Sequence, residues 1–228
     1  TLDIGYFANI MNKYPIAVNV AGEVDGTVAK ISGKNLSLES LHTLFQGDAT
    51  IIGLPDIDNT LFDITSIDAT TSGNDLNALI PQTKTSGIDW NKLSTIEYKG
   101  SYEGMVSNFY TKGTLSTNLG NAAIELNMDF KPDQPTYQGH IETASFDIGQ
   151  LIKQSQLGKI GLNGKIDGNG FDLDHLNAKV DAVVSSIGFE GNTYSDLTIN
   201  GIVAKKKFDG IFISKDPGLE MNFNGIVD

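Results

Sequence analysis

The sequence predicts an all-β fold, a repeated antiparallel meander with one apolar face. Three observations predict it. Apolar and polar residues alternate with a period of two, turn residues separate the alternating segments, and a short motif headed by aspartate recurs at equal spacing. Glycine is abundant, with 25 residues against 6 prolines, which is typical of many short strands joined by tight turns.

The alternation is clearest in segments where apolar residues and glycines share one face and polar residues the other. These segments are 16–24, 96–106, 124–130, 176–184, 197–203 and 219–225. Such a pattern specifies strands with one dry and one wet face, whereas a doubly covered parallel sheet would show continuous apolar runs. Gly100, Gly164 and Gly201 fall within strands on the apolar face. There they permit bends or bulges, or leave room for a group to approach the backbone.

The recurring motif begins at Asp3, Asp75 and Asp147, which are spaced 72 and 72 residues apart. Each aspartate is followed by an aliphatic residue and, four positions on, by a large apolar residue. Because aspartate caps helix N-termini, each site predicts a short amphipathic helix, at about 3–13, 74–80 and 147–155. The chain is therefore expected to be one elongated domain of three units, 1–73, 74–146 and 147–228. Each unit would hold about four strands, which advance roughly 19 Å at about 4.8 Å per strand.

The chain begins and ends within this pattern, which predicts a fragment of a longer protein. A sheet cut in this way exposes unpaired edge strands that tend to pair with another copy. We expect such edges near residues 16–24 and 219–227.

Composition excludes several classes of partner and chemistry. The formal net charge is −12 and every basic residue is lysine, which argues against nucleic acid and against an anionic bilayer surface. The one basic run, 205–207, predicts a solvated turn. The absence of cysteine excludes zinc–thiolate sites, disulfides and thiol nucleophiles. No stretch of 18 apolar residues is present, so we expect a soluble chain.

No catalytic or metal-binding constellation emerges from the sequence. His42, His140 and His175 are widely scattered. The segment 167–174 fails the EF-hand template, because Phe171 occupies a ligand position and an aspartate the required glycine. We therefore expect no enzyme activity, no cofactor and no metal. A glycosidase acid pair cannot be dismissed on inventory, but a single tryptophan offers few sugar-binding platforms.

Three segments, 53–60, 194–201 and 216–225, resemble the TamB-like branch of the AsmA-like proteins, especially the Bacteroidota versions of this translocation and assembly module. The resemblance covers essentially the whole chain. It departs at Asp216-Pro217-Gly218, where the family pattern would have Asp-Pro-Asn.

The resemblance implies a curved, open β-groove (a β-taco) with an apolar interior, located in the periplasm. The full-length protein would be anchored in the inner membrane of a Gram-negative bacterium. The resemblance also implies a role in outer-membrane biogenesis, with an outer-membrane barrel of the BamA family as a partner reached through parts outside residues 1–228.

The leading hypothesis is accordingly a non-enzymatic conduit that carries phospholipid, or another acyl-chain ligand, between the two membranes. Residues expected to line its groove are Val18, Val20, Val24, Ile96, Tyr98, Tyr102, Val106, Ile124, Leu126, Met128, Phe130, Ile160, Leu162, Ile166, Leu176, Val180, Val184, Leu197, Ile199, Leu219, Met221 and Phe223. The alternative is a structural or adhesive β-solenoid with a closed apolar core. Alternation alone cannot separate them, because inward-facing residues look the same in a groove and in a core.

Overall fold

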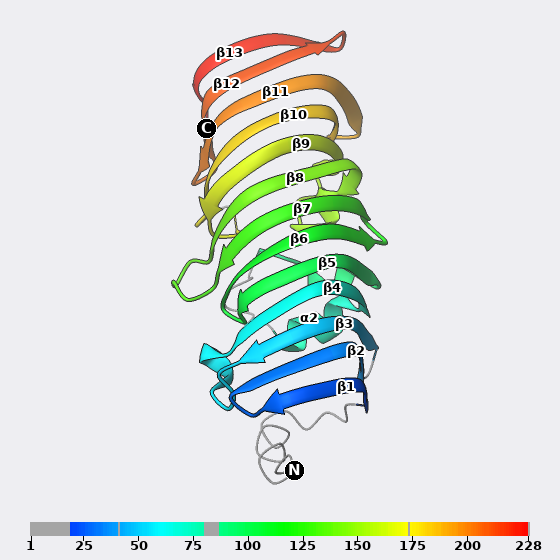
Figure 1. Ribbon diagram of the computed structural model, residues 1–228. Helices are drawn as coiled ribbons and strands as arrows, with labels where there is room; N and C mark the ends of the chain where they lie inside the picture. The colour runs from blue at the N-terminus through cyan, green and yellow to red at the C-terminus, as the bar shows by residue number, and fades with distance from the viewer. Residues whose placement is uncertain (1–18, 41, 80–86, 173, 228) are drawn as a thin grey trace.

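The computed structural model describes residues 19–40, 42–79, 87–172 and 174–227. Its framework is one open antiparallel sheet of 13 strands, and their order in space is their order in the chain. Figure 1 shows them stacked from β1 at the blue end to β13 at the red end. The expected all-β meander is thus confirmed. The helix expected at 3–13 and the proposed lining residue Val18 lie outside the described residues.

The strands are β1 (Asn19–Thr27), β2 (Lys30–Ser40), β3 (Thr43–Ile52), β4 (Leu61–Thr71), β5 (Ile96–Met105), β6 (Asn108–Thr117), β7 (Gly120–Asp129), β8 (Thr136–Asp147), β9 (Leu157–Asn169), β10 (Asn177–Phe189), β11 (Asn192–Ala204), β12 (Lys207–Asp216) and β13 (Leu219–Val227). The helical segments are η1 (Ile57–Asn59), α2 (Gly73–Leu79), η3 (Trp90–Lys92) and α3 (Ile148–Leu151). The helix α2 follows β4, and α3 follows β8, four strands later.

The strand register gathers the apolar residues onto one face of the sheet. Ile124 of β7, for example, lies opposite Gly113 of β6 and Ile141 of β8. Directly opposite residues in antiparallel strands project to the same side, so apolar rows run across the strands. We call this side the apolar face. The opposite side, the polar face, carries cross-strand neighbours such as Glu125 and His140.

Three of the helical segments, α2, η3 and α3, pack on the apolar face at one end of the strands, which we call the cap rim (the ends at Thr71, Ile96, Asp147 and Leu157). A buried cluster forms there from Leu93, Ile96, Leu119 and Phe146, with Leu76, Trp90, Leu115 and Leu151 packed against it. Because α2, η3 and α3 are too short to be stable alone, this apolar contact is what holds them in place.

The sheet curves around its apolar face. Gly87 lies so close to the Phe171 carbonyl, just beyond the far end of β9, that a Cβ there would clash. Only two residues later, the amide of Asp89 donates to the carbonyl of Leu151, the last residue of α3 in the connection that leads into β9, at 2.7 Å. Two residues span at most about 7 Å, whereas a flat strand of 13 residues is about 43 Å long. The connections at the two ends of β9 therefore approach each other over the apolar face, and residues 87–93, the crossing segment, bridge them.

The motif aspartates behave differently in the two described units. Asp147 caps α3 as expected, since its carboxylate accepts from the Gln150 amide at 3.1 Å, although the helix ends at Leu151. Asp75 is not the cap of α2, which corrects the expectation. Ser72 takes that position and accepts from the Asp75 amide at 3.2 Å. The Asp75 carboxylate instead accepts from the His42 amide at 3.2 Å, so it ties α2 to the start of β3.

The buried carboxylate of Asp216 links β12 to β11 and to the turn before β13 through hydrogen bonds. One oxygen of Asp216, at the end of β12, accepts from both the amide and the hydroxyl of Ser195, at 2.8 and 2.9 Å. Its other oxygen accepts from the Gly218 amide at 2.7 Å. Together these donors, Gly218 first, hold the pKa of Asp216 below its usual range.

We expect Asp216→Asn to lower the melting temperature at neutral pH, because an amide nitrogen cannot accept the hydrogen bonds that one carboxylate oxygen accepts. A carboxyl with a depressed folded-state pKa stabilises the fold above its unfolded pKa, and this stabilisation disappears as the pH falls through the folded value. The difference between wild type and variant should therefore shrink in acid. Melting curves from pH 7 down to about pH 3 test this. A difference independent of pH would show that the charge of Asp216 has no part in it.

Candidate binding face

The candidate site is the apolar face itself, and most of the expected lining residues lie on it. Those that belong to strands and share this face are Val20, Val24, Ile96, Tyr98, Tyr102, Ile124, Leu126, Met128, Ile160, Leu162, Ile166, Val180, Val184, Leu197, Ile199, Leu219, Met221 and Phe223. Val106 does not, because it lies in the turn between β5 and β6 and is 58% exposed. This corrects its expected place in the lining. Leu176 lies just before β10, and Phe130 just after β7.

Exposure varies along the apolar face. Ile96, Val184 and Leu197 are 5%, 1% and 2% exposed, so they belong to the packed part of the face. At the two ends of the sheet the apolar side chains are open to solvent: Val20 on β1 is 63% exposed and Met221 on β13 is 40% exposed. Most of the other strand residues of the set are half-buried. The face is thus best covered around the cap and accessible toward its ends.

A row of aromatic rings follows the strand ends opposite the cap rim. The ring centroids of Tyr102 and Phe109 are 4.7 Å apart, and those of Phe109 and Phe130 are 6.3 Å apart. Phe171 continues the row, with centroids 6.5 Å from Phe130 and 5.3 Å from Tyr137. We call these strand ends the aromatic rim. The offset ring contacts stabilise this rim beyond simple area burial.

Only part of the aromatic rim was expected from the sequence. Phe109 lies in β6, a strand whose apolar side also carries Thr111 and Gly113, so its alternation is weak. Phe171 lies in a connection, where no periodicity marks it. Burial raises the pKa of Tyr137 to about 12, so its hydroxyl remains a hydrogen-bond donor to the Gly170 carbonyl across the physiological range.

The glycines on the apolar face make room for the protein's own side chains. The hydroxyl of Tyr98 lies over Gly100 and Gly113, where a Cβ on either glycine would clash with it. That hydroxyl forms a hydrogen bond of 2.6 Å with the hydroxyl of Thr111. The ring of Phe208 covers Gly201 in the same manner. Of the two roles considered for these glycines, close approach to the backbone is therefore fulfilled by aromatic side chains at Gly100 and Gly201, and by Ala182 at Gly164.

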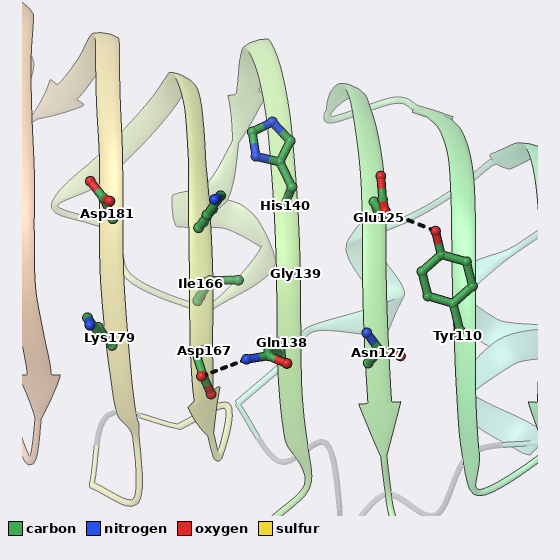
Figure 2. Close-up of a pocket in the computed structure, with 11 residues that line it drawn as sticks. Tyr110, Glu125, Asn127, Gln138, Gly139, His140, Ile166, Asp167, Lys179 and Asp181 are labelled. Atoms are coloured by element: carbon green, nitrogen blue, oxygen red, sulfur yellow. Dashed lines mark hydrogen bonds between the residues drawn. The ribbon is translucent and has the colours of Figure 1, made fainter.

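The polar face carries a shallow hollow of about 580 Å³ over β6 to β10. Figure 2 shows the polar side chains around it on neighbouring strands, with Tyr110 donating to Glu125 and Gln138 donating to Asp167. Lys112 also binds Glu125, at 2.9 Å from Nζ to Oε2. Lys112 and Tyr110 together hold the pKa of Glu125 below its usual range.

This hollow has the chemistry of a solvated, charge-paired sheet surface. Along one row, Glu125, His140, Lys165 and Asp181 lie opposite one another on successive strands, so opposite charges largely neutralise locally. Among the described residues, no three His, Asp or Glu side chains come close enough to hold a metal ion. The basic run also follows expectation, since Lys205 and Lys206 form the exposed turn between β11 and β12.

Comparison with known proteins identifies no relative: no family model, no curated protein and no solved structure matches this chain. In the part of the chain that the structure describes, no helix is long and apolar enough to cross a bilayer. The candidate site thus rests on the sheet's own geometry, an apolar face that continues through all 13 strands of an open sheet.

Proposed function

We propose that the apolar face holds the acyl chains of phospholipid and serves, without catalysis, as a conduit for lipid between the inner and outer membranes. One observation carries the proposal. A single apolar face runs across all 13 strands, and among the described residues no second sheet covers it. Thirteen strands at about 4.8 Å spacing give a path of roughly 58 Å.

Physical chemistry favours acyl chains as the occupant. Burial of apolar surface stabilises by about 0.8 kcal/mol per CH₂ and needs no directional partner, so a chain can slide along a row of aliphatic side chains. The side chains of Val20 on β1 and Met221 on β13 are exposed, so an acyl chain could reach the face at either end of the described sheet. The crossing segment lies over the face near β8 and β9, so a passing chain would run between it and the sheet.

The resemblance to TamB-like members of the AsmA-like family supports the same function. On that reading the protein works in the periplasm of a Gram-negative bacterium, its longer form is anchored in the inner membrane, and a BamA-family barrel receives it at the outer membrane. A structural β-solenoid is the alternative. The burial of Val184 and Leu197 favours it, because tight packing of that kind is also what a closed core needs.

Native mass spectrometry of the chain purified from a Gram-negative host tests the proposal. We expect phospholipid adducts that survive gentle desolvation and disappear after delipidation, then return on incubation with phospholipid. A maltose-binding or other soluble protein without an apolar face, carried through the same purification, is the control. Adduct-free spectra before and after incubation would favour the closed solenoid.

A further inference from the structure

The crossing segment, residues 87–93, closes the mouth of the groove near β9. The mouth is the open side of the curved sheet, between the cap rim and the aromatic rim. Gly87 contacts the Phe171 carbonyl at the aromatic rim, and the amide of Asp89 donates to the Leu151 carbonyl on the side of the cap rim, at 2.7 Å. Because two residues reach at most about 7 Å, the protein's own backbone fills the mouth at this place.

The fit at Gly87 leaves no passage between the crossing segment and the aromatic rim. A Cβ at this position would overlap the carbonyl carbon and oxygen of Phe171 and crowd the amide nitrogen of Asp172. These are backbone atoms, which cannot turn aside as a flexible side chain can. A gap that does not admit one methyl group does not admit the phosphate of a lipid.

A phospholipid in the proposed conduit has two parts with opposite requirements. Its acyl chains lie against the apolar face. Its phosphate is charged and stays in water, because an unpaired charge in apolar surroundings is costly. The headgroup therefore travels along the mouth, where it meets the crossing segment near β9. It can go further only when that segment moves.

The two sides of the crossing segment are held in different ways. On the cap side, the Leu93 carbonyl accepts from the Gly73 amide at 2.7 Å. Leu93 is also buried in the cluster under the cap, and Trp90 packs against that cluster. On the other side, Gly87 is half-buried and meets Phe171 through close backbone contact. The cap side is thus the anchored side, and the Gly87 side is the one that can open at low cost.

We propose that the crossing segment is a gate for the phospholipid headgroup, which opens when Gly87 leaves Phe171 while the part from Trp90 to Leu93 stays in place. The inference rests on the proposed function, since it requires that phospholipid moves along the apolar face. It adds that one backbone contact limits this movement. An alkane has no charged group at the mouth, so it can run between the segment and the sheet without this opening.

Gly87→Ala tests the gate, because the added methyl group pushes the crossing segment away from the Phe171 carbonyl. Transfer of pyrene-labelled phosphatidylcholine between two populations of phosphatidylcholine vesicles should become about fivefold faster, the low end of what overpacking a tight contact costs. Transfer of a pyrene-labelled alkane should hardly change. Gly158→Ala is the matched control, since the nearest contact of its methyl group, with Gly188, would be an ordinary 3.4 Å.

Phe171→Ala tests the same contact from the aromatic rim. It removes the ring that packs on Phe130 and Tyr137 and so loosens the connection that Gly87 touches. Hydrogen exchange followed by NMR measures the opening without lipid. In both variants the amides of residues 87 and 88 should exchange faster than in the wild type. Those of residues 91–93 should keep their protection, which also shows that the variants are folded.

The outcomes separate the gate from the conduit. If the wild type transfers phosphatidylcholine and Gly87→Ala transfers it at the same rate, the gate is overturned and the conduit stands. If neither transfers it, the conduit fails and the gate fails with it. Equal acceleration of phosphatidylcholine and alkane would also overturn the gate, because it would show a wider path beneath the segment. So would unchanged exchange at residues 87 and 88 in both variants.

Discussion

Ile199→Asp is expected to abolish phospholipid binding while the protein stays folded. Ile199 is half-buried on β11, on the apolar face, with Ala182 of β10 and Phe212 of β12 on either side. A carboxylate there lies in the path of an acyl chain, and an unpaired charge against hydrocarbon is costly. If the face is open, the same carboxylate stays partly hydrated in the free protein, so the free energy of unfolding changes little.

Neighbours on the same strand provide matched controls. Thr198→Asp adds the same charge on the polar face and should change neither lipid binding nor melting. Leu197→Asp places the charge at a side chain that is 2% exposed, and should cost several kcal/mol, a large part of the roughly 5–15 kcal/mol that stabilises a typical domain. Thermal melting and a fluorescent-phospholipid titration of all three variants separate the effects.

The result that contradicts the conduit is equally specific. If Ile199→Asp unfolds the protein as Leu197→Asp does, and the wild type takes up no lipid, the apolar face is a closed core. The structural solenoid would then be the better interpretation. If Ile199→Asp folds and still binds lipid as the wild type does, the lipid occupies another part of the surface.

Strands with unbroken alternation could be located from the sequence, and the others could not, for identifiable reasons. β5, β7 and β11 keep a period of two on the apolar face. β2 loses it at a register shift between Gly33 and Leu36, and β4 loses it between Ile64 and Ile67. A bulge inserts one residue and moves every later side chain to the other face, so the periodic signal cancels.

The strand residues of the apolar face could be predicted from the sequence, but the segments that pack over this face could not. Residues such as Ile124 and Ile166 are placed by strand periodicity, which the sequence carries locally. The crossing segment and Phe171 are placed by curvature, which brings the connections before and after β9 together and depends on the whole sheet. The cap of α2 shows the same limit on a smaller scale. Ser72 and Asp75 both satisfy capping chemistry, and only the tertiary bond from His42 to Asp75 decides between them.

The last prediction concerns the buried cluster under the cap. Phe146→Ala should lower the local free energy of unfolding by about 3–5 kcal/mol, because the ring is 8% exposed and its loss leaves a cavity among Leu93, Ile96 and Leu119. Phe189→Ala is the matched control. Its ring, at the end of β10, is 41% exposed, so the change should cost less than about 0.5 kcal/mol.

Hydrogen exchange followed by mass spectrometry is the suitable measurement, because each strand of this sheet pairs only with its chain neighbours and can open locally. In Phe146→Ala we expect faster exchange in α3, the crossing segment and β5 to β9, which contact the cluster directly or through one strand. Protection in β12 and β13, three or more strands away from β9, should remain as in the wild type. Loss of protection spread evenly over all strands would instead show that the sheet unfolds as one cooperative unit, and that the cap stabilises its full length.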